Sequence, residues 1–301
     1  MTRRILLVGH PGRPRAIEVA RDLVEGLRAN DIVVCGDPTE LAEFGLLGAD
    51  GVEPVEVSEP APGTELTVVL GGDGTILRAA ELVRESGIPL LGINLGHVGF
   101  LAEAEPDDIH HIVQGIVQRS WTVESRQTLE VLARVDGEIV CHSWALNEAT
   151  VEKAARERML ELVVEIDGRP LSTWGCDGVV VSTPTGSTAY AFSAGGPVIW
   201  PGVEAMLVCP ISAHALFARP LVLGPQARLA IEMVPRTEAR GVLWFDGRRS
   251  FELPPGARVE VRMDSKLVVE QMSGRWKIKH PDMQQLALQA RAIARQLGDS
   301  S

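Results

Sequence analysis

The residues best suited to chemistry form the run Gly71-Gly72-Asp73-Gly74-Thr75. It follows an apolar run at 68–70 and precedes a helical pattern from Ile76 to Val83. Glycines let the backbone approach phosphate oxygens because no Cβ intervenes, and a helix N-terminus supplies positive potential. An aspartate there would repel phosphate, so it needs a task, such as accepting a proton from an attacking hydroxyl or holding Mg²⁺. A tight turn capped by Asp73 is the alternative, but the strand–loop–helix context favours phosphoryl transfer.

Motifs that are absent narrow the class of phosphoryl-transfer chemistry. The sequence contains no Walker A run ending in Gly-Lys-Ser/Thr and no Gly-x-Gly-x-x-Gly fingerprint. It also lacks the HRD and DFG sequences of protein kinases. The run at 71–75 therefore belongs to a different class of phosphoryl-transfer enzyme.

Two further places carry polar groups near predicted strands. Asn94 follows the buried strand predicted at 89–93, where it suits either a ligand contact or a turn cap. Asn147 and Glu148 end another predicted strand, and their amide and carboxylate suit an adenine edge or ribose hydroxyls. On these residues alone, a surface pair at a strand end is the favoured interpretation.

A third segment is dense in hydroxyl groups. Thr183, Thr185, Ser187 and Thr188 surround Gly186. Such a loop can wrap a polar ligand, or it can be a plain turn in which the hydroxyls bond to their own backbone.

The residues of these motifs together resemble a known family. The GGDG at 71–74 resembles the signature shared by NAD kinases, 6-phosphofructokinases and the diacylglycerol and sphingosine lipid kinases. Three segments resemble NAD kinases specifically: GINLGHVGFL at 92–101, LNE at 146–148, and DGVVVSTPTGSTAY at 177–190 continuing to SAGGP at 193–197. The match covers most of the chain from Thr67 to Arg248. The chain is identified as a member of the NAD kinase family.

The resemblance implies the reaction and its participants. The γ-phosphoryl group of ATP would pass to the 2′-hydroxyl of the adenosine ribose of NAD, giving NADP, with Asp73 accepting the proton and Mg²⁺ or another divalent cation neutralising charge. No metal site made of protein ligands alone is predicted. A lipid or sugar kinase with the same loop and a non-catalytic NAD-sensing protein are the alternatives. The hydroxyl-rich segment counts against the first, and Asp73 counts against the second.

The binding residues follow from the same motifs. The resemblance implies NAD contacts from Asp73, Gly74, Asn147, Glu148, Asp177, Thr188, Ala189, Tyr190, Ala191, Phe192 and Ser193. We also expect ligand contacts from Gly72, Asn94, Arg78 and Arg158, and from Arg248, whose register in the family motif is not fixed.

The elements that must position these residues fall into two domains. Residues 1–122 alternate strand and helix signals, which predicts an α/β domain of Rossmann-like, phosphofructokinase-like type, joined by the helical tail 277–301. Residues 36–63 are expected to form a surface loop with a short helix. In residues 123–276, Asp-Gly pairs at 136, 167 and 246 separate strand-like runs, which predicts hairpins and an antiparallel, β-sandwich-like domain for NAD binding and oligomerisation.

Composition and charge limit the kinds of binding partner and the cellular location that we expect. A formal net charge of −11 argues against a nucleic-acid partner. No apolar run approaches the roughly 20 residues that span a bilayer, and no signal peptide is recognisable, so a cytoplasmic protein is expected. The four scattered cysteines predict neither disulfides nor zinc. The resemblance implies a homotetramer or homodimer, while use of polyphosphate or of NADH stays open.

Overall fold

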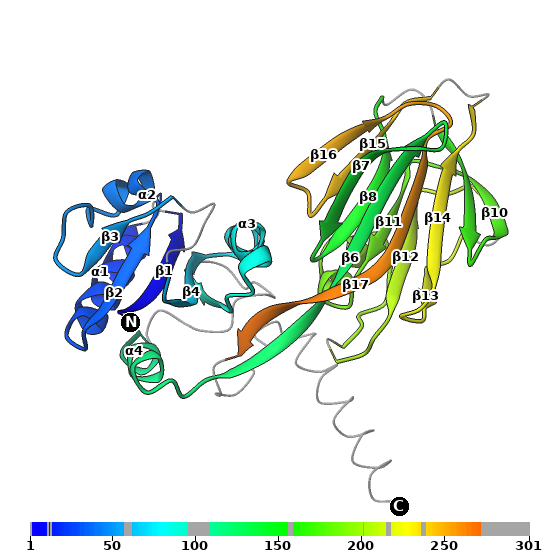
Figure 1. The fold of residues 1–301 in the computed structure, drawn as a ribbon. Helices are drawn as coiled ribbons and strands as arrows, with labels where there is room; N and C mark the ends of the chain where they lie inside the picture. The colour runs from blue at the N-terminus through cyan, green and yellow to red at the C-terminus, as the bar shows by residue number, and fades with distance from the viewer. Residues whose placement is uncertain are drawn as a thin grey trace, which may run out of the picture. The chain divides into compact units, whose positions relative to one another are not determined.

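The computed structural model describes residues 2–10, 12, 14–56, 62–95, 109–155, 159–200, 202–214, 218–235 and 239–271, with side chains through Asp264. It divides into two compact units, one of Met1–Glu124 together with the segment from Val268, the other of Ser125–Leu267. Figure 1 draws residues 1–124 in blue through cyan to green, and the second unit in green through yellow to orange. The predicted helical tail 277–301 lies outside the described residues.

The first unit is built on a parallel sheet of five strands in the order β3-β2-β1-β4-β5. This confirms the predicted α/β architecture. The strands are β1 (Arg3–Gly9), β2 (Ile32–Gly36), β3 (Val52–Pro54), β4 (Thr64–Gly71) and β5 (Leu90–Asn94). The helices are α1 (Pro14–Arg28), α2 (Pro38–Glu43), α3 (Asp73–Val83), the short 3₁₀ turn η1 (Arg84–Ser86) and α4 (Ile109–Gln118).

Helices cover both faces of this sheet. Helices α1 and α4 pack on each other and share one apolar cluster with alternate residues of the strands, such as Leu66, Val68 and Leu70. Helix α3 packs on β4 and β5 from outside that cluster. The chain runs from β1 to β2 in one direction and from β4 to β5 in the other, so right-handed crossovers place the helices on opposite faces. The order of strands reverses between β1 and β4, which is where such sheets bind ligands.

The segment predicted as a surface loop is more regular than the sequence suggested. Helix α2 confirms the short helix, and the carboxylate of Asp37 caps it by accepting from the N–H groups of Thr39 and Glu40. Strand β3 was not predicted, because only three residues pair with β2 and one of them is Pro54. A proline is tolerated there because β3 is an edge strand.

The second unit consists of two six-stranded sheets, in the orders β10-β9-β14-β17-β6-β7 and β13-β12-β11-β8-β15-β16. The first comprises β6 (Thr122–Val135), β7 (Glu138–Ala145), β9 (Leu160–Ile166), β10 (Arg169–Cys176), β14 (Arg228–Met233) and β17 (Arg258–Gln271). The second comprises β8 (Glu148–Lys153), β11 (Gly178–Ser182), β12 (Met206–Ile211), β13 (Leu221–Leu223), β15 (Gly241–Phe245) and β16 (Arg249–Leu253). Between β11 and β12 lie the 3₁₀ turn η3 (Thr185–Thr188) and the one-turn helix α5 (Tyr190–Ser193).

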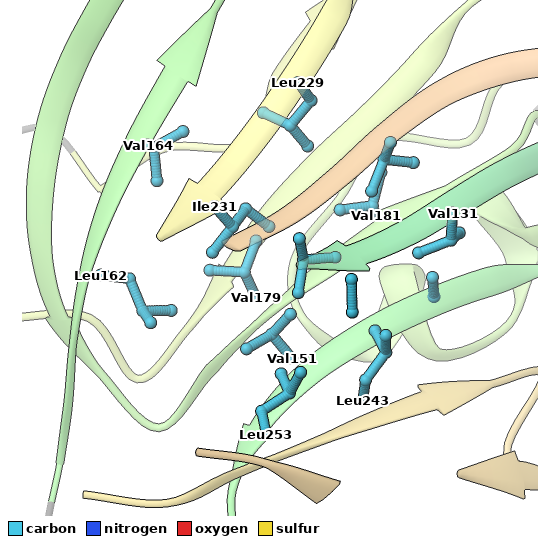
Figure 2. Packing of buried hydrophobic residues seen from close by; sticks show 14 of the residues in the cluster. Val131, Val151, Leu162, Val164, Val179, Val181, Leu229, Ile231, Leu243 and Leu253 are labelled. Carbon is cyan, nitrogen blue, oxygen red and sulfur yellow. The ribbon is translucent and has the colours of Figure 1, made fainter. Parts of the chain in front are cut away.

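Apolar side chains from both sheets meet in one core, which confirms the sandwich-like prediction. Figure 2 shows Leu162, Val164, Leu229 and Ile231 of one sheet among side chains such as Val179 of the other. Successive residues of a strand point to opposite faces, so alternate residues of each strand enter this core. On the opposite face of the second sheet, Val180, Leu207 and Cys209 pack in a smaller apolar cluster with Ala191 and Ile199.

The three predicted Asp-Gly hairpins are confirmed. Asp136, Asp167 and Asp246 have φ values of 50°, 52° and 53°, and each is followed by a glycine of positive φ. They join β6 to β7, β9 to β10 and β15 to β16. Two consecutive residues of positive φ give the turn whose twist matches that of antiparallel strands.

No helix in the described part of the chain is long and apolar enough to cross a membrane.

Candidate active site

The phosphate loop (residues 71–75) joins β4 to α3 at the carboxyl edge of the parallel sheet. Gly72 is the residue that precedes the helix, in an extended conformation, and Asp73 is the first helical residue. The N–H groups of Thr75 and Ile76 return to the carbonyl of Gly72 at 2.9 and 3.1 Å. The interpretation of Asp73 as the helix cap is therefore wrong, because its side chain lies in the first turn and does not take the capping position.

The glycines of the phosphate loop differ in whether packing within the protein requires them. A Cβ on Gly71 would lie 2.3 Å from the Oγ1 of Thr75, so packing within the protein excludes any larger residue. A Cβ on Gly72 or Gly74 would meet no described atom within 4 Å, and neither has a positive φ. Among the described residues, no packing contact requires glycine at these two positions. Their open backbone at a helix N-terminus suits a phosphate group approaching from outside.

Asn94 lies beside the phosphate loop. It ends β5, pairs with Gly71 in the parallel register, and is buried. The N–H of Leu95 donates to the carbonyl of Gly71 at 3.3 Å. The rest of the 92–101 motif, from residue 96, lies outside the described residues.

Arg78 is held by the end of β1. Its guanidinium forms an ion pair with Glu40 and donates to the carbonyl of Gly9 at 2.9 Å. The other carboxylate oxygen of Glu40 accepts from the N–H of Gly9 at 2.9 Å. Arg78 thus ties α3 to the end of β1, and its predicted phosphate contact stays a prediction.

The second group of predicted residues lies entirely within the β-rich unit. The Asn-Glu segment (residues 146–148) joins β7 to β8, and Glu148 begins β8. The prediction that this pair ends a strand is therefore wrong. Asn147 and Glu148 are only 6% and 7% exposed, so the surface-pair interpretation is wrong as well. Both side chains have been withdrawn from water.

These two side chains present unsatisfied oxygens. The Oδ1 atom of Asn147 and the Oε2 atom of Glu148 are buried and have no hydrogen-bond partner in the described structure. Leaving such a group unpaired costs about 1–3 kcal/mol, more for a charged group. Two such groups on adjacent residues require an explanation, and a hydrogen-bonded polar ligand is one that would satisfy both.

Hydroxyl groups of the 182–188 segment hold the backbone of the Asn-Glu segment. The carbonyl of Asn147 accepts from the N–H of Thr183 at 2.9 Å and from the hydroxyl of Ser182 at 3.1 Å. The Thr183 hydroxyl donates to the carbonyl of Leu146 at 2.6 Å. A Cβ on Gly186 would lie 2.1 Å from the Asn147 carbonyl oxygen, so only glycine permits this contact.

The remaining hydroxyls of this segment are also used internally. The hydroxyl of Ser187 donates to the carbonyl of Pro184 at 2.7 Å and accepts from the N–H of Ile199 at 2.9 Å. Thr188 donates to the carbonyl of Thr185 at 3.4 Å. The alternative of hydroxyls bonded to their own backbone therefore describes these side chains. What the segment presents outward is Tyr190, Phe192 and Ser193, while Ala191 is buried and Ala189 half-buried.

Glu148 titrates near neutrality. Burial and, after it, the charges of Asp246 and Glu152 together raise its pKa to about 7, against the opposing effect of a hydrogen bond from the backbone of Tyr190. The protonated and ionised forms are therefore comparably populated at pH 7, so the carboxyl group can donate to a ligand as well as accept from one.

Further acidic groups share this outer face of the second sheet. Glu152 and Glu148 lie on the same side of β8, opposite the core residues Ala149 and Val151. Burial and then the charges of Glu152, Glu148 and Asp177 raise the pKa of Tyr190, so its hydroxyl is within electrostatic range of all three carboxylates. Sequence reasoning missed Glu152, because only the alternation of β8 brings it next to Glu148.

Asp177 is found in an ion pair with Lys153 at 2.5 Å, between the end of β8 and the start of β11. Arg248 is exposed in the β15–β16 turn, and its backbone N–H donates to the carbonyl of Phe245 at 3.0 Å. Arg158 lies outside the described residues.

Sequence reasoning also missed Asp246. Its Asp-Gly dipeptide was fully explained by a hairpin turn, yet its carboxylate is buried and accepts from the backbone N–H groups of Leu146, Asn147 and Glu148. No local pattern signals a contact between residues so far apart in the chain.

The two units together define a class of protein. A doubly wound sheet whose switch point carries an open Gly-Asp-Gly helix start, and a β-rich unit with unsatisfied amide and carboxylate oxygens, define a phosphotransferase with a polar acceptor. Residues 53–121 match the ATP-NAD kinase N-terminal domain, and residues 146–268 match the ATP-NAD kinase C-terminal domain. The chain belongs to the ATP-NAD kinase family.

Similar proteins support this membership. An NAD kinase of Thermobifida fusca (strain YX) is 57% identical over 267 residues, which covers 86% of this chain and 81% of that protein. NAD kinase 2 of Streptomyces coelicolor is 56% identical over 262 residues, with 86% of each chain covered. The crystal structure of yeast NADH kinase complexed with NADH superposes with a TM-score of 0.81 at 24% identity, covering 90% of this chain and 84% of that one. This last likeness shows the fold alone.

Proposed function

We propose that this enzyme transfers the γ-phosphoryl group of ATP to the 2′-hydroxyl of the adenosine ribose of NAD, giving NADP. The observation that carries the choice of acceptor is the pair of buried, unpartnered oxygens on Asn147 and Glu148. An amide and a carboxyl group can between them donate to and accept from an adenine edge and ribose hydroxyls. Membership of the ATP-NAD kinase family supports the same assignment.

The phosphate loop supplies the phosphoryl-transfer chemistry. The open backbone of Gly72 and Gly74 and the N-terminus of α3 would hold phosphate oxygens as charge develops on them. Asp73, in the first turn of the same helix, would accept the proton of the attacking hydroxyl. Preorganised donors of this kind stabilise the transferring group without reorganisation at the moment of reaction.

A divalent cation fits the loop only together with its substrate. No group of three or more His, Cys, Asp or Glu side chains in the described residues is arranged to hold a metal. Mg²⁺ is usually bound by one or two carboxylates with water and substrate phosphates. Asp73 is a suitable single carboxylate, and the ion would neutralise charge on the ATP phosphates when bound.

A coupled assay with ATP and NAD tests the proposal directly. The product is expected to be reduced to NADPH by an NADP-specific dehydrogenase, and phosphorus NMR is expected to place the new phosphate on the 2′ oxygen. Turnover of a lipid or sugar without NAD turnover would contradict the assignment, and binding of NAD without turnover would indicate a sensor. Replacing ATP by polyphosphate in the same assay determines the range of donors.

We also propose that the enzyme is a homotetramer or homodimer. Exposed apolar side chains lie on the edge strands of the β-rich unit, with Ile139 and Val140 on β7 and Leu171 on β10. Apolar side chains on unpaired strand edges favour association. Light scattering at micromolar concentration is expected to give a multiple of the 32.5 kDa chain mass, and a monomer alone would contradict this.

A further inference from the structure

We propose that Asp246 is a positioning residue of the NAD site, whose buried carboxylate fixes the backbone of the Asn-Glu segment so that Asn147 and Glu148 are oriented before the ligand arrives. This inference rests on the proposed function, because it assumes that these two side chains bind NAD.

Three successive backbone amides converge on one carboxylate. The Oδ2 atom of Asp246 accepts from the N–H of Leu146 at 3.0 Å, and Oδ1 accepts from those of Asn147 at 2.7 Å and Glu148 at 3.2 Å. The N–H of Asp246 donates in return to the carbonyl of Glu148 at 2.9 Å. Hydrogen bonds to an ionised acceptor are stronger than neutral ones, so the segment has little freedom to move.

The charge of Asp246 is stabilised in its turn. Burial raises the pKa of Asp246, and the amides of the Asn-Glu segment and the guanidinium of Arg249 oppose that rise. The guanidinium lies 3.4 Å from Oδ2, over the ring of Trp144 at 4.8 Å, and donates to the Trp144 carbonyl at 2.8 Å. Stacking on an aromatic ring holds the planar guanidinium in place beside the carboxylate.

The other two Asp-Gly turns show that the turn itself does not require this arrangement. Asp136 and Asp167 have nearly the same φ as Asp246, but both are exposed. The carboxylate of Asp167 accepts from the N–H of Arg228 at the surface, at 2.9 Å. Asp246 alone of the three is buried, at 6% exposed, and its side chain is directed at the segment that carries the unsatisfied oxygens.

Asp246 also influences the ionisation of the residue that it positions. The groups that act on Glu148 are the carboxylates of Asp246 and Glu152, which raise its pKa, and the backbone N–H of Tyr190, which lowers it. Replacing Asp246 by asparagine removes one of the two charges. The pH at which NAD affinity changes with the ionisation of Glu148 is then expected to fall, which a purely structural role would not produce.

Calorimetric titration of NAD into the wild-type protein, Asp246→Asn and Asp167→Asn tests the proposal. We expect Asp246→Asn to raise the Kd for NAD roughly 10- to 100-fold, the scale of one lost hydrogen bond to a charged group. The KM for ATP is expected to stay within about 2-fold, and the pH midpoint of NAD affinity is expected to shift downward. The control, Asp167→Asn, alters an equivalent turn and is expected to behave as wild type.

A second variant keeps the proposal testable if Asp246→Asn does not fold. Arg249→Met retains the carboxylate but removes its guanidinium neighbour, and several-fold weaker NAD binding is expected. If wild type binds NAD and folded Asp246→Asn binds it with the same Kd and pH midpoint, this proposal is overturned and the proposed function is not. If Asp246→Asn does not fold, an unchanged Kd for NAD in Arg249→Met has the same consequence. Failure of the wild type to bind NAD would overturn the proposed function and this inference with it.

Discussion

The phosphate loop and the Asn-Glu segment are assembled in opposite ways. The loop is one run of five residues, whose geometry follows from the end of β4 and the start of α3. The Asn-Glu segment is held by Asp246, 98–100 residues away, and by Ser182 and Thr183, 35–37 residues away. In the phosphate loop, Gly72 and Gly74 can therefore be altered with little effect on folding, whereas in the Asn-Glu segment binding and folding depend on the same contacts.

The largest effect is expected from Asp73→Asn in the phosphate loop. The substitution keeps size and hydrogen bonding but removes the base, so kcat is expected to fall roughly 10²- to 10⁴-fold. The Kd for NAD and the thermal stability are expected to change little, since the carboxylate does not cap the helix. Asp50→Asn, at an exposed carboxylate of the same unit, is the matched control. Near-normal turnover in Asp73→Asn would remove this residue from the catalytic role.

A substitution in the Asn-Glu segment is expected to weaken binding of the acceptor, NAD. Glu148→Ala removes a buried carboxyl group, and we expect the KM for NAD to rise about 10- to 100-fold, the effect of losing a hydrogen bond to a charged group. The KM for ATP is expected to change far less. Initial-rate kinetics with each substrate varied in turn measures both, and Glu252→Ala, at an exposed site on β16, is the control. An unchanged KM for NAD would show that Glu148 does not recognise the acceptor.

Two glycine substitutions compare the two regions directly. Gly186→Ala places a Cβ against the Asn147 carbonyl, so the free energy of unfolding is expected to fall by about 3 kcal/mol, with a loss of NAD affinity. Gly72→Ala meets no described atom, so stability is expected to be retained while the KM for ATP rises. Denaturant unfolding and kinetics measure the two effects. A stable Gly186→Ala protein with normal NAD binding would contradict the tertiary origin of the segment's geometry.

The most gradual effect concerns pH. Because the pKa of Glu148 is raised to about 7, the folded protein binds a proton that the unfolded chain releases near pH 4.5. Its contribution to stability is therefore present below about pH 4.5 and is lost as the pH rises through about 7, by about 3 kcal/mol. Subtracting the unfolding free energies of Glu148→Gln from those of wild type isolates this residue. A difference that stays constant over that range would contradict the raised pKa.

The parts of the fold that the sequence predicted are those governed by local patterns. Asp-Gly pairs located three hairpins because the required positive φ values suit these two residue types. The apolar run before Gly71 and the helical pattern after it located the phosphate loop. Strand β3 was missed because three residues at a sheet edge carry no periodic signal.

In the candidate site too, the features that depend on neighbouring residues were predicted, and those that depend on tertiary contacts were not. Composition and order of residues determined that a Gly-Gly-Asp-Gly-Thr run would meet a helix N-terminus, since backbone geometry at a strand–helix junction depends on adjacent residues. Only the tertiary structure decided that Asn147 and Glu148 are buried with unpaired oxygens. It also decided that the hydroxyls of Ser182 and Thr183 donate to backbone carbonyls of the Asn-Glu segment, and that the carboxylate of Asp246 accepts from the backbone of that segment. Burial and pairing depend on which strands lie side by side, and the contact between β8 and the β15–β16 turn exists only once the sheet has formed.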